Sequence, residues 1–110
     1  MAYDRFVYWN KTKALVPTRE DVGAVLAAYL GAGGTVEWVE GQGRFYANLA
    51  GPGSDPRQPK DLLRGTRWFE VFIHEDSVDV ITRQADSFTN AVADGFANVC
   101  MRQWDGRRSE

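Results

Sequence analysis

Four strand-like segments follow one another between two helix-like segments, and this order constrains the fold more than any other feature. Hydrophobic and polar residues alternate along each strand-like segment, as in strands with one buried face. These segments are 35–40, 44–49, 68–74 and 77–83. The helix-like segments span 18–30 and 86–104, and an aromatic, β-prone segment at 3–9 predicts a further strand. The predicted order is therefore β-α-β-β-β-β-α.

The four consecutive strands pair as two hairpins. Gly41–Gln42 predicts a type II′ turn that places Trp38 opposite Phe45. A turn at Glu75–Asp76 predicts the second hairpin. The second hairpin's predicted pairs are Phe69 with Thr82, Val71 with Val80 and Ile73 with Val78. In both hairpins this register keeps apolar residues together on one face, which supports it.

Each helix-like segment carries one apolar stripe and begins at a residue that can cap a helix. Thr18 is a good N-cap for the first helix, and Asp86 or Ser87 could cap the second. The predicted stripes are Val22, Val25, Leu26, Tyr29 and Leu30 in the first helix, and Phe88, Val92, Phe96, Val99 and Cys100 in the second. The sheet face expected to meet them comprises Val36, Trp38, Phe45, Ala47, Leu49, Phe69, Val71, Ile73, Val78 and Val80.

These segments predict an α+β fold, with a mostly antiparallel five-stranded sheet and both helices packed on one face. At 110 residues the chain has the length of one domain, which we expect over 1–104. Residues 51–66 contain three prolines and form a connection longer than is usual. Residues 105–110 form a polar C-terminal tail.

With both helices on one face, the outer sheet face has no predicted cover, and aromatic residues gather on it. Contiguous aromatic and arginine side chains are typical of protein interfaces. The predicted partner-binding residues are Tyr46, Trp68, Glu70, Phe72, His74, Asp79, Ile81 and Arg83. Arg57, Lys60 and Arg64 make the long loop locally basic, and we predict a second contact there. The loop could also fold over the outer face.

Charge and motifs exclude several other classes. A net charge of -2 argues against a general binder of nucleic acid. The start of the chain has no apolar stretch of signal-peptide length, so we expect a cytoplasmic protein without membrane contact. The acidic residues match no metal-binding motif, and the glycines match no phosphate-binding loop, so no metal or cofactor is predicted. Cys100 lies on a predicted buried stripe, which favours a structural role.

We therefore interpret the chain as a small binding or regulatory protein. It would act through its outer sheet face, by self-association as a dimer or by inhibiting a partner, which fits toxin-immunity pairs by analogy only. The alternative is a small-ligand-binding domain or enzyme, with a pocket on the outer face formed by His74, Asp79 and Arg83. Catalysis is disfavoured because Glu70, which shares a strand face with the single imidazole, His74, lies four residues away along the strand, too far for a direct pair.

Overall fold

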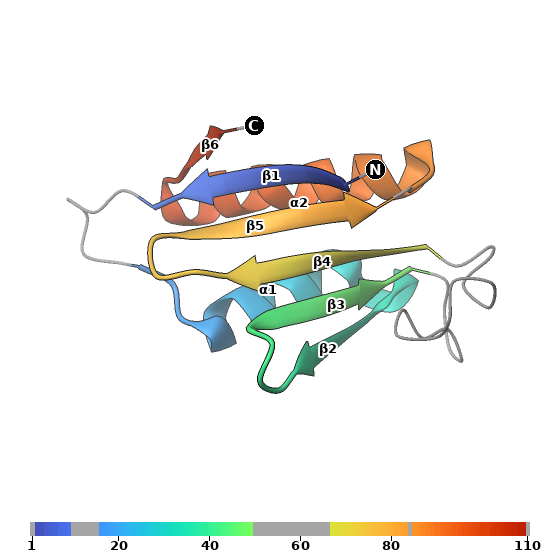
Figure 1. The fold of residues 1–110 in the computed structure, drawn as a ribbon, viewed down its shortest axis with the longest axis horizontal. Helices are drawn as coiled ribbons and strands as arrows, with labels where there is room; N and C mark the ends of the chain where they lie inside the picture. The colour runs from blue at the N-terminus through green and yellow to red at the C-terminus, as the bar shows by residue number, and fades with distance from the viewer. Residues whose placement is uncertain (1, 10–15, 50–66, 84, 110) are drawn as a thin grey trace.

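The computed structural model describes residues 2–9, 16–49, 67–83 and 85–109. Its described part is an α+β fold, as predicted, with a single antiparallel sheet and two α-helices. The elements are β1 (Ala2–Tyr8), α1 (Arg19–Leu30), the short 3₁₀ turn η1 (Gly31–Gly33), β2 (Thr35–Val39), β3 (Arg44–Asn48), β4 (Trp68–Ile73), β5 (Ser77–Arg83), α2 (Ser87–Trp104) and β6 (Arg107–Ser109). The strands lie in the order β2-β3-β4-β5-β1-β6 (Figure 1). The predicted loop at 51–66 lies outside the described residues.

Both hairpins have the predicted register. Trp38 lies opposite Phe45, and Val71 lies opposite Val80. The second turn is also as predicted, because the His74 N–H donates to the Ser77 carbonyl at 2.9 Å across Glu75–Asp76. These registers follow from the alternation of apolar residues, which fixes which side chains must share a face.

The first turn differs from the predicted one. The Gln42 N–H donates to the Val39 carbonyl at 3.2 Å, so Glu40 and Gly41 occupy the centre of the turn. Gly41 has a φ of 81°, a left-handed value that glycine tolerates without strain. The prediction of Gly41–Gln42 as the central pair was therefore wrong by one residue, although the strand register is unchanged.

The C-terminal residues add a sixth strand, where the sequence predicted five strands and a tail. The helix α2 ends at Trp104 and is capped by Asp105, which adopts the left-handed conformation with a φ of 53°, so that the chain turns back. β6 then pairs with β1, with Arg108 opposite Val7. Gly106 permits this close approach, because a Cβ at this position would lie 2.6 Å from a Val7 methyl carbon. Hydrophobic periodicity misses β6 because its three residues are all polar.

Both helices begin at predicted caps. Thr18 accepts from the Asp21 N–H, and the Asp21 carboxylate accepts from the Thr18 N–H, which forms a complete capping box. Asp86 caps α2 by accepting from the Thr89 N–H at 2.7 Å. The stripe of α1 is also on the predicted side, with Val22 and Leu26 buried.

The buried face of α2 is rotated from the predicted one. Phe88 is 51% exposed, and the guanidinium of Arg67 lies 4.8 Å from its ring centroid. The residues of α2 that are buried are Thr89, Ala93, Phe96, Ala97 and Cys100. Small side chains at Ala93 and Ala97 allow α2 to pack closely on the sheet, and Phe88 lies outside this contact.

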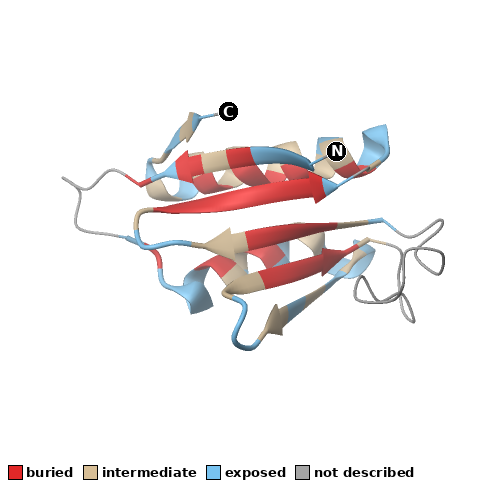
Figure 2. Ribbon diagram, in the orientation of Figure 1, coloured by how far each residue is buried: buried red, intermediate tan, exposed pale blue. Residues whose placement is uncertain are grey.

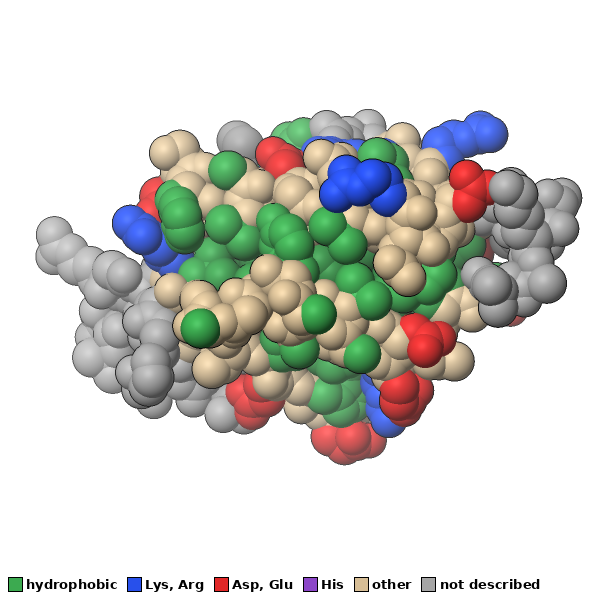
Figure 3. Space-filling model, turned by 180° about the vertical axis from the view of Figure 1, so that it is seen from behind, with side chains coloured by type: hydrophobic (Ala, Val, Ile, Leu, Met, Phe, Trp, Pro, Cys, Tyr) green, Lys and Arg blue, Asp and Glu red, His purple; other side chains and the backbone are tan. Residues whose placement is uncertain are grey.

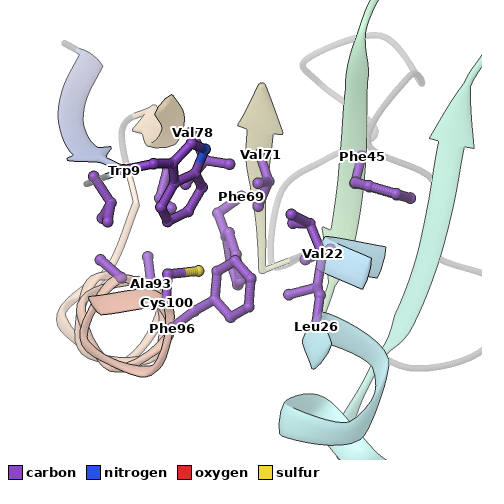
Figure 4. Packing of buried hydrophobic residues seen from close by; sticks show 14 residues of the cluster. Trp9, Val22, Leu26, Phe45, Phe69, Val71, Val78, Ala93, Phe96 and Cys100 are labelled. Atoms are coloured by element: carbon purple, nitrogen blue, oxygen red, sulfur yellow. The ribbon is translucent and has the colours of Figure 1, made fainter. Parts of the chain in front are cut away.

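The core lies between the helices and the sheet. Figure 4 shows Phe69 pointing from β4 towards Phe96 of α2, and their ring centroids are 6.4 Å apart. Val22 and Leu26 of α1 lie on the other side of Phe69 (Figure 4). Apolar side chains run across the middle of the helix side of the molecule (Figure 3). Both helices lie behind the sheet in Figure 1, so the described part of the chain places no helix or strand over the other sheet face.

Candidate functional site

The predicted partner-binding residues all lie on the sheet face opposite the helices. Tyr46, Glu70 and Ile81 lie side by side across three strands, and the alternating residues of the same strands face the same way. We call this surface the open sheet face. Its described members are Asp4, Phe6 and Tyr8 of β1, Glu37 of β2, Arg44 and Tyr46 of β3, Trp68, Glu70 and Phe72 of β4, His74 after β4, and Asp79, Ile81 and Arg83 of β5. The predicted loop contacts Arg57, Lys60 and Arg64 lie outside the described residues.

A buried carboxylate holds two arginines at the centre of the open sheet face. Glu70 is 1% exposed and pairs with Arg44 and with Arg83, whose Nε lies 2.7 Å from Glu70 Oε1. The hydrogen bond to Glu70 raises the pKa of Arg83. A buried charge is costly unless it is paired and hydrogen-bonded, and Glu70 has a partner for each of its oxygens. The cluster therefore fixes both guanidinium groups on the open sheet face.

Aromatic rings surround this ion cluster. The guanidinium carbon of Arg44 lies 4.9 Å from the ring centroid of Tyr46 and 5.2 Å from that of Phe72. Trp68 packs edge-on against Tyr46, with 6.0 Å between centroids, and His74 stacks on Phe72 at 6.5 Å. Arginine-aromatic contacts of this kind hold side chains in fixed positions.

The first strand, β1, extends the open sheet face. The sequence did not predict where β1 lies in the sheet. β1 lies beside β5, with Asp4 opposite Ile81 and Phe6 opposite Asp79. Phe6 and Tyr8 stack with 6.0 Å between centroids, and Tyr8 is 42% exposed. The alternation of Asp4, Phe6 and Tyr8 predicts that they share a face, but no local signal indicates which strand β1 joins.

Asp79 occupies an unusual electrostatic position on this face. It is 5% exposed, and almost the whole of β5 is buried (Figure 2). Burial, together with the hydrogen bond that the protonated Asp79 carboxyl donates to the neighbouring Asp4, raises the pKa of Asp79 to about 7. Among the described residues, no donor reaches Asp79 Oδ1. Titratable groups with such shifts often mark functional sites.

The alternative pocket residues do not converge along β5. His74 is next to the start of β5, where its N–H bonds the Ser77 carbonyl, whereas Arg83 is at the end. The seven residues from Ser77 to Arg83 are separated by six steps along the strand, which span roughly 20 Å. Asp79 lies between them, so the open sheet face presents His74 and Arg83 as separate groups.

A second polar cluster lies on the helix side and was missed by sequence reasoning. Arg5 is 1% exposed and pairs with Asp94 of α2, and it donates to Asn90 Oδ1 at 3.0 Å. Arg108 of β6 donates to the same Asp94 oxygen at 2.8 Å and to Asn98 at 3.2 Å. The i, i+4 spacing of Asn90, Asp94 and Asn98 places them on one helix face, but this spacing does not indicate that strand arginines cover that face.

The described residues provide neither a reactive cysteine nor a metal site. Cys100 is fully buried, and burial raises the pKa of its thiol to about 12, which keeps it unreactive. Within the described ranges, no group of three acidic, histidine or cysteine side chains could hold a metal ion. No helix among those same residues is both long and apolar enough to cross a membrane.

Comparison of the chain with protein-family models, with curated proteins and with solved structures found no match. Function is therefore inferred from the chain's own side chains. Of the surfaces described above, the open sheet face brings together the most groups that recognise other molecules: aromatic rings, arginines and a carboxyl with an unsatisfied oxygen.

Proposed function

We propose that this chain is a small binding protein that acts by contact with another protein through its open sheet face. One observation carries the proposal. Both helices pack on one side of the sheet, and the other side, which no described helix or strand covers, carries aromatic rings around a fixed arginine pair (Figure 1).

The composition of the open sheet face supports a protein ligand. Aromatic residues and arginine are enriched at the centres of protein interfaces, where they supply most of the binding energy. Trp68 and Phe72 are half-buried by their neighbours and Tyr8 is 42% exposed, so each offers apolar area to a partner. Because Trp68 and Phe72 already have ring contacts, they lose little conformational entropy on binding.

The partner is either a second copy of the chain or a larger protein that this chain inhibits. A 12.3 kDa chain with a net charge of -2 has the size and charge of inhibitors such as those in toxin-immunity pairs, by analogy only. Both forms of the proposal use the same surface. The same substitutions therefore test both.

The test compares aromatic substitutions on the two sides of the molecule. Trp68→Ala and Phe72→Ala remove rings from the open sheet face, and Phe88→Ala is the matched control, because Phe88 is exposed on the helix side. Light scattering at two protein concentrations measures self-association. If the chain dimerises, we expect Trp68→Ala and Phe72→Ala each to weaken the dimer by about tenfold or more, and Phe88→Ala to leave it unchanged.

If the chain is monomeric, the same three variants are compared for affinity to a purified partner. We again expect losses of about tenfold or more for the two open-face variants alone. A dimer or a complex that survives the combined Trp68→Ala and Phe72→Ala substitution, with the variant still folded by circular dichroism, would show that the open sheet face is not the interface.

A further inference from the structure

Two carboxyl groups and an aromatic pair meet on the β1 side of the open sheet face. Asp79 of β5 lies directly opposite Phe6 of β1, and Asp4 is the diagonal neighbour of Asp79 on the same face. Opposite residues in an antiparallel pair have Cβ atoms only about 5 Å apart, and diagonal ones remain within side-chain reach. Asp4 is exposed and Asp79 is 5% exposed. In this carboxyl pair, Asp4 is therefore accessible to solvent and Asp79 is buried.

Asp79 has an acceptor that the described part of the chain leaves unsatisfied. Its Oδ1 atom is buried and receives no hydrogen bond from any described residue. Leaving a buried polar atom without a partner is energetically costly, so such atoms are rare in native structures. No described helix or strand covers this sheet face. Once Asp4 moves away from Asp79, a donor from another molecule can therefore supply the missing hydrogen bond.

The charges around Asp79 also favour an added cation. Asp4 lies diagonally from Asp79 on β1, Glu70 lies diagonally on β4, and Arg83 is four residues along β5. Glu70 forms ion pairs with both Arg83 and Arg44, and Arg83 also acts on Asp4 and Asp79 through its charge. His74, at the end of β4, stacks on Phe72, the other cross-strand neighbour of Asp79. With Asp4 and Asp79 both ionised, this group of three carboxylates and two arginines lacks one positive charge.

The chemistry of the pair selects an organic cation. A divalent metal ion needs about six oxygen ligands, and no described cluster of three or more metal-binding side chains exists here. A guanidinium or ammonium group needs fewer acceptors and also binds aromatic faces, such as those of the stacked Phe6 and Tyr8. We propose that Asp4 and Asp79 recognise a basic side chain of the partner protein, inserted beside Phe6. This inference rests on the proposed function of the open sheet face.

The test uses a charged probe and its uncharged analogue. Nα-acetyl-arginine N-methylamide presents a guanidinium group, and the matching citrulline derivative has nearly the same shape without the charge. The ¹³C signal of the Asp79 carboxyl is followed by NMR over a pH range, with each probe in large excess. We expect the arginine probe to shift this signal and to lower the titration midpoint of Asp79 by about 1 pH unit or more, and the citrulline probe to do neither.

Substitutions test the same site independently. Asp79→Asn and Asp4→Asn should each weaken binding of the arginine probe by about tenfold, as expected for the loss of a charged partner. Glu75→Gln, an exposed carboxylate in the β4–β5 turn, makes the same change in net charge and should have no effect. Binding by wild type should strengthen between about pH 6 and about pH 8, because the cation displaces the proton from the pair.

An unchanged Asp79 signal, or equal shifts from both probes, would overturn the proposal without any variant. The outcome also separates this inference from the proposed function. If Trp68→Ala and Phe72→Ala abolish protein contact while the arginine probe leaves Asp79 unaffected, the open sheet face is an interface that does not recognise a cation. If the probe binds but those two substitutions leave protein contact intact, the carboxyl pair is a site and the aromatic part of the open sheet face is not the interface.

Discussion

At the scale of single residues, Asp79 links the ionisation of the open sheet face to the stability of the fold. Its pKa is raised to about 7 by burial and by the hydrogen bond that protonated Asp79 donates to Asp4, whereas an aspartate in an unfolded chain titrates near pH 4. Between these values the folded state binds more protons than the unfolded state. The free energy of unfolding therefore falls as the pH rises from about 4 to about 7, and the contribution is lost above that range.

This slope gives a measurable prediction. Asp79→Asn keeps the neutral form at every pH, so it should remove a slope of at most about 1.4 kcal/mol per pH unit between about pH 4 and about pH 7. Urea unfolding at a series of pH values measures it. Glu75→Gln, an exposed carboxylate, is the control and should retain the wild-type slope. If the free energy of unfolding of Asp79→Asn keeps the wild-type dependence on pH, a group other than Asp79 binds the proton.

At the scale of elements, the two helices meet where a glycine faces a tyrosine. The Tyr29 hydroxyl of α1 donates to the Val92 carbonyl of α2 at 2.8 Å. A Cβ placed on Gly95 would lie 2.1 Å from that hydroxyl oxygen. The absence of a side chain at Gly95 therefore allows α1 and α2 to share this hydrogen bond.

Gly95→Ala tests this contact because two effects compete. Alanine in a helix interior is about 1 kcal/mol more favourable than glycine, but the steric overlap with Tyr29 should reverse the sign and destabilise the fold by about 1 to 3 kcal/mol. In a Tyr29→Phe background the hydroxyl is gone, so the same substitution should cost less. Chemical denaturation of the four proteins gives the coupling energy. Equal costs in both backgrounds would show that the overlap relaxes elsewhere.

The elements show what local patterns can and cannot predict. The hairpin registers and the caps at Thr18 and Asp86 were predicted because each depends on neighbouring residues alone. The rotation of α2 was not predicted, since it depends on how closely the helix approaches the sheet. β6 was also missed, because three polar residues become a strand only when another strand supplies hydrogen bonds.

At the scale of the whole molecule, Asp94 joins the two ends of the chain to the last helix. It pairs with Arg5 of β1 and with Arg108 of β6. Burial alone would raise the pKa of Asp94, but hydrogen bonds from both arginines lower it. The open sheet face depends on this network indirectly, because β1 carries Asp4 and Phe6 on the other side of the sheet.

We expect Asp94→Ala to destabilise the fold by about 3 kcal/mol, because it leaves the buried guanidinium of Arg5 without a carboxylate. Glu20→Ala, which breaks the exposed pair with Arg19, should change stability little. Hydrogen exchange should locate the loss in β1 and β6. Replacing Arg5 and Asp94 together by leucine should recover part of the stability, and a double variant no better than Asp94→Ala would argue against an unpaired buried charge as the cause.

The strand order is the part of the architecture that the sequence does not reveal. Alternation predicted that Tyr46, Glu70 and Ile81 share a face, because each lies in a hairpin whose register is local. It did not predict that β1 lies between β5 and β6, so the approach of Asp4 to Asp79 was missed. Arg5, likewise, has no sequence signal for burial, since its carboxylate partner is 89 residues away.

The placement of β1 also dictates when the sheet can be completed. Among the described strands β1 comes first along the chain, but its partner β5 ends at Arg83 and its other partner β6 ends at Ser109. The β2–β3 and β4–β5 hairpins need only local contacts and can form during synthesis, whereas joining β1 to β5 closes a loop of most of the chain. Until β1 pairs with β5, that edge of β5 carries unpaired backbone N–H and C=O groups, which favours association with another chain.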